Sequence, residues 1–163
     1  DDREYFFDNL GIMAAPPLSS HGPCVNEFST DPKTCVIEIG RSACSGNALV
    51  QALQTVFMAG SYDVFLKNCN SFSDVALYYL TRTRLPSQYS RLERFIAATS
   101  PVSTGLLNKM FKALLERKTG KPCEEDVYAR NPEAEFFSSE KVIALLDEVT
   151  AESDSEGEVS EYA

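Results

Sequence analysis

Three adjacent residues, Asn68, Cys69 and Asn70, could do chemistry together. Asparagine caps helices well, so we expect Asn68 to begin a helix and Cys69 to lie in its first turn. The helix dipole and the unpaired N–H groups of that turn favour the thiolate over the thiol. A thiolate is a nucleophile, and the same N–H groups could hold the oxyanion that forms when it attacks a carbonyl carbon. Cys69 is therefore the candidate catalytic nucleophile, with Asn68 and Asn70 as candidate supports for the oxyanion and the site.

Simpler interpretations stay open for these three residues. Cys69 could instead be a buried structural cysteine, because small thiols are common in protein cores. Asn68 and Asn70 could serve only to cap and solvate the start of the helix.

The candidate site lies where the sequence pattern changes from strand to helix. Residues 62–66 are rich in aromatic and β-branched side chains, which favours a short buried strand. Tyr62 and Phe72 are expected to lie in the core. We expect the helix to end before Pro86, since the residue before a proline avoids the helical conformation. Beyond Cys69, apolar residues recur at the spacing of one helical face: Phe72, Val75, Ala76, Tyr79 and Leu80.

Upstream of the site, the sequence predicts two strands and a helix. Residues 4–7 form an aromatic run with strand character, and residues 34–39 predict a second strand. Prolines within residues 12–33 predict a loop between them. Residues 46–58 predict a helix, and Gly60 suits a left-handed cap at its C-terminal end.

Downstream of the site, the sequence predicts three more helices. Residues 106–115 predict a strongly amphipathic helix that ends before Gly120. The final helix, over residues 139–149, has an apolar face that either docks onto the domain or waits for a partner. The first of the three covers residues 89–98, with three side chains inward: Leu92, Phe95 and Ile96.

These elements predict an α+β architecture in four parts. Residues 1–100 form the main domain, and residues 101–120 extend it with a helix. Residues 121–138 are polar and predict a linker. Residues 139–163 predict a short helix followed by an acidic, disordered tail.

The net charge of −9 is concentrated near the C-terminal end. Seven acidic residues and no Lys or Arg follow residue 141, which leaves 17 acidic against 15 basic residues in the rest of the chain. The body is thus nearly neutral, which argues against nucleic acid as a partner. No apolar run approaches the roughly 18 residues of a membrane helix, so a membrane is not an expected partner either.

The five cysteines are an odd number without a C-x-x-C pair, which fits neither a disulfide framework nor a zinc site. The sequence opens on charged residues rather than on a secretion signal. We therefore expect reduced thiols and a location in the cytosol or the nucleus.

Residues 62–80, followed by Leu85 and Pro86, resemble the catalytic block of the PPPDE family. These are isopeptidases with a permuted papain fold, and they include the deSUMOylating isopeptidases. The shared pattern is Tyr-x-Leu/Val-x-x-x-Asn-Cys-Asn-x-Phe-Ser, which begins here at Tyr62. Residues 4–12 are similar to the family's aromatic hairpin and residues 36–40 to its next strand. The resemblance covers about residues 1 to 90.

The resemblance implies a permuted papain-like cysteine peptidase that acts on ubiquitin or ubiquitin-like conjugates without a metal or organic cofactor. Cys69 would attack the isopeptide carbonyl, and a histidine would be the general base. In the family this histidine lies on the strand before the hairpin, a position that would fall a few residues before Asp1. We therefore expect the sequence to be truncated at its N-terminus. His21, the single histidine of the sequence, does not correspond to that position.

Two other functions stay open. The protein could be a catalytically inactive relative that binds ubiquitin-like proteins, with the helix at residues 142–149 contacting partners. It could also be an acyltransferase or lipase of the related lecithin-retinol-acyltransferase group. That group typically has Asn-Cys-Glu-His-Phe, from which Asn70 and Ser71 depart. The sequence does not indicate which modifier would be removed, nor the oligomeric state.

Overall fold

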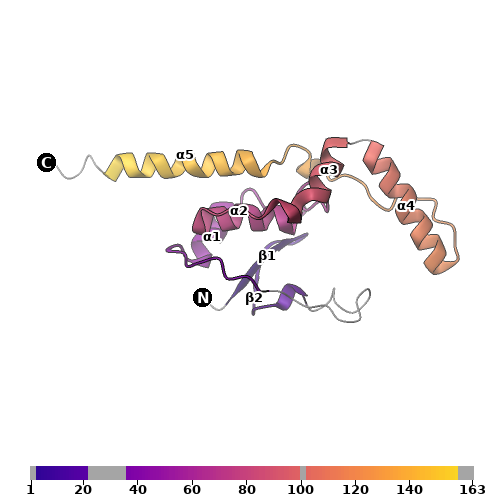
Figure 1. The fold of residues 1–163 in the computed structure, drawn as a ribbon, viewed down its shortest axis with the longest axis horizontal. Coiled ribbons are helices and arrows are strands. Elements are labelled where there is room, and N and C mark those ends of the chain that lie inside the picture. Colours follow the sequence, from indigo (N-terminus) through magenta and orange to yellow (C-terminus); the bar gives the residue numbers. More distant parts are fainter. Residues whose placement is uncertain (1–2, 22–35, 100–101, 158–163) are drawn as a thin grey trace.

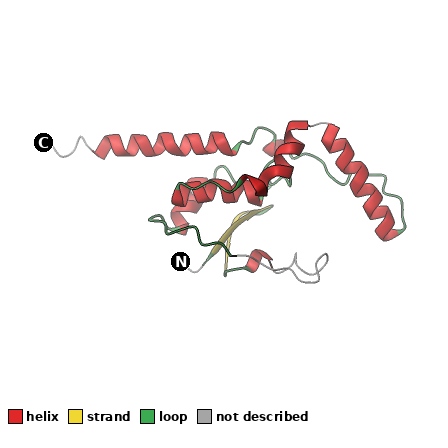
Figure 2. Ribbon diagram, viewed as in Figure 1, coloured by secondary structure: helices red, strands yellow, loops and turns green. Residues whose placement is uncertain are grey.

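The structure, a computed structural model, describes residues 3–21, 36–99 and 102–157. In these ranges a small antiparallel hairpin packs against helices, which is an α+β arrangement, and Figure 2 shows how little of the chain is strand. The hairpin is β1 (Glu4–Asp8) and β2 (Gly11–Ala15), and helices α1 (Gly46–Leu53) and α2 (Cys69–Thr81) lie over it (Figure 1). The remaining helices are α3 (Arg91–Thr99), α4 (Val102–Thr119) and α5 (Ser139–Gly157).

The hairpin that the resemblance implied is present, and its second strand covers residues that the local sequence pattern assigned to a loop. β2 pairs with β1 so that Phe7 lies opposite Ile12 and Asp8 opposite Gly11. Gly11 has φ +99, and a Cβ there would lie 3.2 Å from the backbone nitrogen of Ala59, so only glycine fits this turn without strain. The predicted loop over residues 12–33 is therefore wrong for residues 12–15, because pairing with β1 decides their conformation.

The main core joins the hairpin to α1, α2 and α5. Phe57 packs edge-on against both Phe7 and Phe72, with ring centroids 5.0 and 5.3 Å apart. The predicted apolar face of α2 is confirmed at its buried members, Phe72, Val75 and Ala76. The other buried residues of this core are Leu49, Leu53, Val142 and Ile143.

Helix α1 is shorter than predicted. Ser45 caps it, since its hydroxyl accepts a hydrogen bond from the N–H of Ala48 at 3.2 Å. The helix ends at Leu53, and the buried face continues to Phe57 through a turn. Gly60 is left-handed, with φ +76, yet it lies in a later turn, where its N–H donates to the carbonyl of Asn9 at 2.9 Å.

Neither of the predicted strands after the hairpin forms in the described residues. Residues 62–66 make a turn closed by the bridge between Asp63 and Lys67. The Asp63 carboxylate accepts hydrogen bonds from the N–H groups of Phe65 and Leu66, both at 2.9 Å, and so competes with strand pairing.

The predicted strand over residues 34–39 is also wrong where it is described. Residues 36–39 are irregular, and Val36 and Ile37 are 75% and 59% exposed. β-branched residues favour strands when a pleated, half-buried surface receives them, and no described strand provides one here.

Residues 121–131, part of the predicted linker, pack back onto the turn before Cys69. The Tyr128 ring meets Phe65 edge-on at 4.9 Å, and its hydroxyl donates to the Asp63 carboxylate at 3.0 Å. The backbone N–H of Asn131 donates to the same carboxylate at 2.9 Å, and its side chain donates to the carbonyls of Gly60 and Tyr62 at 2.7 and 3.0 Å. This segment is therefore part of the packed body rather than a spacer.

Helices α3 and α4 form as predicted, but the side chains that they bury differ in part from those predicted to lie inward. In α3, Ile96 is buried as expected, whereas Phe95 is 63% exposed, and the side chain of Leu92 lies outside the described residues. α4 ends before Gly120 as predicted. The side chain that it buries against Tyr128 is polar, however: the Asn108 amide donates to the Tyr128 carbonyl and accepts from its N–H, both at 2.8 Å.

Helix α5 docks onto the domain, which settles the alternative left open by the sequence. Val142 and Ile143 enter the main core. Asp147 accepts hydrogen bonds from the Tyr78 hydroxyl and the Arg82 guanidinium, each at 2.8 Å. The helix runs to Gly157, so the predicted disorder is wrong for residues 153–157, and residues 158–163 lie outside the described part.

We predict that Tyr128→Phe lowers the free energy of unfolding by about 1–3 kcal/mol, the usual cost of removing a hydrogen bond to a charged, buried group. Asp63 is 3% exposed and would lose one of its donors. Urea denaturation would measure the change. Tyr89→Phe, at a tyrosine 43% exposed, is the matched control, and equal losses in the two variants would contradict the prediction.

Candidate active site

Asn68 caps helix α2 as the sequence predicted. Its side-chain oxygen accepts a hydrogen bond from the N–H of Ser71 at 3.0 Å, and the Ser71 hydroxyl accepts in return from the N–H of Asn68 at 3.4 Å. The Asn68 amide also donates to the carbonyl of Val64 at 2.9 Å. These contacts fix the helix start to the preceding turn, so Asn68 positions the site. A direct contact between Asn68 and an oxyanion stays a prediction.

Cys69 is the first residue of the helix and is exposed to solvent. The structural alternative, a thiol buried in the core, therefore does not hold. The N–H of Phe72 donates to the Asn68 carbonyl at 3.0 Å, so both Phe72 and Ser71 turn their N–H groups toward the cap. The N–H groups of Cys69 and Asn70 precede these two in the first turn, where an N–H group has no carbonyl of the same helix to donate to.

The hydroxyl group of Tyr62 contacts Cys69, which the helix and strand patterns of the sequence did not indicate. Burial, followed by the negative charge of the Cys69 thiolate and a hydrogen bond to it, raises the pKa of Tyr62 to about 12. Sequence analysis placed Tyr62 in the core, and its half-buried ring does pack on Phe7 at 5.4 Å. Its hydroxyl group is nevertheless at the candidate nucleophile. Only the position of Tyr62, seven residues before Cys69 in the family pattern, pointed toward this role.

A buried lysine supports the segment just before the nucleophile. Lys67 is 4% exposed, its ammonium donates to the Ser61 hydroxyl at 2.9 Å, and it lies 5.7 and 5.5 Å from the ring centroids of Phe57 and Phe137. Burial lowers the pKa of Lys67. Because Lys67 directly precedes Asn68, these contacts hold the approach to the helix in place.

Asn70 connects the helix start to the next structural element, the short 3-10 helix η2 (Ser87–Ser90). Its side-chain amide donates to the carbonyl of Tyr89 at 2.9 Å. Asn70 also forms part of the wall of two grooves that flank the start of α2. Its role in the described structure is thus to shape the surface beside Cys69.

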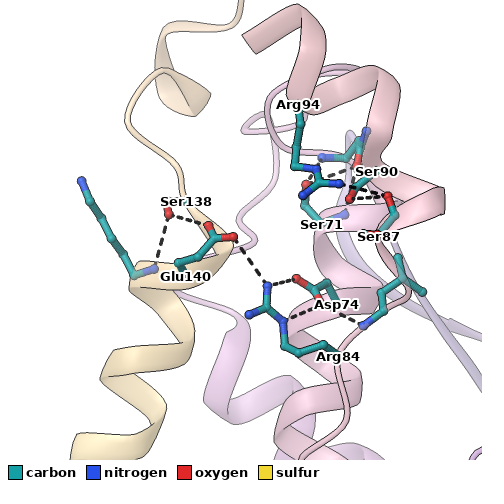
Figure 3. Close-up of polar contacts among 11 residues, drawn as sticks. Ser71, Asp74, Arg84, Ser87, Ser90, Arg94, Ser138 and Glu140 are labelled. Carbon is teal, nitrogen blue, oxygen red and sulfur yellow. Dashed lines mark hydrogen bonds and ion pairs between the residues drawn. The ribbon is translucent and has the colours of Figure 1, made fainter. Parts of the chain in front are cut away.

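The first of these grooves, of about 270 Å³, is polar. Figure 3 shows its side chains, which come from α2, from η2 and α3, and from the start of α5. We call it the polar groove. Its hydrogen-bonding members include Asn70, Ser71, Ser87, Ser90, Arg94, Ser138 and Glu140. The second groove, of about 560 Å³, is more apolar and includes Tyr5, Ile37, Ile39, Leu77, Leu80 and Tyr89.

An ion-pair network closes one side of the polar groove (Figure 3). Arg84 makes two contacts with Asp74, at 2.8 and 2.6 Å, and a longer one of 3.6 Å with Glu140. The hydrogen bonds to Asp74 raise the pKa of Arg84. Arg84 therefore links α2 to α5 across the groove.

Arg94 carries a positive charge on another wall of the polar groove. Its guanidinium donates to the carbonyl of Ser87 at 3.2 Å. Among the described residues, no carboxylate lies within ion-pair distance of it. Carbonyl or carboxylate groups of a bound polypeptide could therefore bind there.

The predicted catalytic histidine has no counterpart in the described site. His21 is the last residue of the 3-10 helix η1 (Ser19–His21), and its side chain lies outside the described residues. A histidine base thus stays a prediction from the family. None of the helices in the described ranges is both long and apolar enough to cross a membrane.

Comparison with known proteins shows which family the chain resembles. The model of the PPPDE putative peptidase domain matches residues 1–111. Desumoylating isopeptidase 1 of Homo sapiens is 25% identical over 100 residues, which cover 59% of this chain and 55% of the relative. The Rattus norvegicus protein of the same name is 24% identical over the same share. The chain thus spans about half the length of these relatives, and residues 112–163 lie beyond the family match.

We predict that Asn68→Ala lowers the free energy of unfolding by about 1–2 kcal/mol, because it removes the helix cap. Asn68→Ser should retain more stability, since serine is also a good cap and its hydroxyl can accept from the N–H of Ser71. Hydrogen exchange at the amides of Ser71 and Phe72 would locate the effect. Equal exchange rates in the wild-type protein and the alanine variant would contradict it.

We predict that Tyr62→Phe flattens the loss of stability at alkaline pH. The unfolded chain releases the tyrosine proton near pH 10.0 and the folded chain near pH 12, so the folded state holds more protons in this window. Stability should therefore fall between these pH values in the wild-type protein, and fall less in the variant. Thermal melting temperatures over this range would measure the difference, with Tyr89→Phe as the control.

Proposed function

Because the chain belongs to the PPPDE peptidase family, we propose that it is a cysteine isopeptidase that removes ubiquitin or a ubiquitin-like modifier such as SUMO from proteins. One observation carries the proposal: the family-pattern cysteine, Cys69, is solvent-exposed at the first position of a capped helix and is flanked by grooves. The names of the relatives support a ubiquitin-like substrate.

In the proposed reaction, the sulfur of Cys69 attacks the carbonyl carbon of the isopeptide bond. The resulting oxyanion accepts hydrogen bonds from backbone N–H groups at the start of α2. Removing one such donor typically costs about 3–4 kcal/mol of barrier. The carbon–nitrogen bond then breaks, and the lysine amine leaves with the proton that came from the thiol. Water hydrolyses the thioester, which releases the carboxylate of the modifier and restores the thiol.

The proton would be carried by a histidine that the family places on a strand before the hairpin, upstream of Asp1. With that strand added, the arrangement would be the permuted papain-like fold, in which the nucleophile begins a helix packed on the sheet. We place the activity in the cytosol or nucleus, where thiols stay reduced.

Tyr62 would act at the same site. With a pKa of about 12 its hydroxyl stays protonated at neutral pH, so it can donate a hydrogen bond to the thiolate. Such a bond orients the sulfur and stabilises its negative charge before attack. Tyr62 would therefore be a positioning residue.

The polar groove is suited to the polypeptide that leads into the scissile bond. It begins at the residues that flank Cys69 and offers Ser hydroxyls, the Arg94 guanidinium and the start of α5. Extended polypeptide presents backbone carbonyls that such donors can bind. The wall made by Ser138 and Glu140 lies beyond the family match, so we propose that it contributes to the choice of substrate.

We predict that the native protein forms a covalent adduct with ubiquitin or SUMO probes that carry an electrophile in place of the C-terminal carboxylate. Mass spectrometry of the digested adduct should locate the bond at Cys69. Cys69→Ala should abolish the adduct, and Cys44→Ala should leave it unchanged, because Cys44 is an equally exposed thiol outside the site.

An adduct that persists in Cys69→Ala would overturn the assignment of the nucleophile. Tight binding of a modifier without adduct formation or cleavage would instead favour the alternative of an inactive protein that binds ubiquitin-like partners.

A further inference from the structure

An apolar surface lies on α3 and α4, away from the candidate active site. A groove of about 320 Å³ runs between these helices. Three residues at its edges, Phe95, Val102 and Leu106, are 63%, 77% and 67% exposed. We call it the α3–α4 groove. Contiguous exposed apolar surface of this kind is unusual unless something binds it.

The apolar residues of α4 form a continuous stripe. Val102, Leu106, Met110 and Leu114 follow one another at intervals of four residues, so they lie on one face of the helix. Met110 and Leu114 are 48% and 56% exposed. The stripe therefore continues the α3–α4 groove along the helix, and a second helix is a suitable occupant.

Basic residues border this stripe. α4 contains Lys109, Lys112, Arg117 and Lys118 against a single acid, Glu116. Lys109 lies three residues after Leu106 and Arg117 three after Leu114, which places their side chains next to the stripe. An apolar helix with acidic borders would complement this surface in both respects.

Helix α5 of this protein has that pattern. Val142 and Ile143 are used to dock it onto α2, while Leu145 and Val149 are 58% and 65% exposed. These two lie four residues apart, and the exposed Glu148 lies between them. After residue 141 the sequence contains seven acids and no base.

The helix cannot reach the groove of its own chain in this arrangement, because α4 and α5 lie at opposite ends of the body (Figure 1). We propose that the α3–α4 groove binds helix α5 of a second copy of this chain. Each copy then offers one groove and one helix, so the contact forms either a closed dimer or a head-to-tail array. Lys109 and Arg117 on α4 and Glu148 on α5 are exposed, so added salt should weaken the association.

Charge reversal tests the proposal. One variant, Lys109→Glu with Arg117→Glu, makes the groove border acidic, and the other, Glu148→Lys with Glu152→Lys, makes the helix basic. Sedimentation equilibrium should show association of the wild-type protein and its loss in each variant alone. Mixing the variants should restore it, because in both contacts of the mixed pair the charges are again opposite.

Circular dichroism would show whether each variant stays folded, which is expected because Lys109, Arg117 and Glu148 are exposed. Arg3→Glu with Arg41→Glu, two exposed cations outside α3 and α4, is the matched control and should associate like the wild-type protein. A wild-type protein that is monomeric at every concentration would overturn the proposal. A mixture that stays monomeric would also overturn it.

Discussion

The buried carboxylate of Asp63 is the interaction on which the rest of the site depends. It accepts hydrogen bonds from the N–H groups of Phe65 and Leu66 and from two donors far along the chain, Tyr128 and Asn131. A buried charge is costly unless it is paired or hydrogen-bonded. The turn before Cys69 and the segment after α4 must therefore fold together, and this turn delivers the capping residue Asn68 to the start of α2.

The groove beside the nucleophile also depends on contacts with residues far along the chain. Arg84 connects Asp74 of α2 to Glu140 of α5, and Phe137 covers the ammonium of Lys67. Both connections reach into residues beyond the family match. The shape of the candidate site is thus set by the family core together with a segment that this chain adds to it.

The sequence predicted the local features of the site and missed the distant ones. Helix periodicity and capping preferences depend on residues within one or two turns, which is why α2, its Asn68 cap and the place of Cys69 in the first turn were predictable. Strand formation depends on a neighbouring strand, so residues 12–15 were missed and residues 62–66 were assigned wrongly. The contact of Asp63 with Tyr128 depends on the tertiary fold, and no spacing in the sequence encodes it. The contact of Tyr62 with Cys69 was indicated only by the spacing of the two residues in the family pattern. Phe95 was predicted to be inward because its helix is amphipathic, but periodicity does not reveal whether anything covers a given face.

The limit of the family match falls inside helix α4, which runs from Val102 to Thr119. A piece of the protein cut at that limit would lose nearly half of this helix, the donors Tyr128 and Asn131 to Asp63, and the Phe137 ring beside Lys67. The segment that matches the family model is therefore shorter than the segment that packs together as one folded unit. For this protein, the boundaries for expression and mutagenesis should follow packing, which extends at least through Leu146 and Asp147, rather than homology.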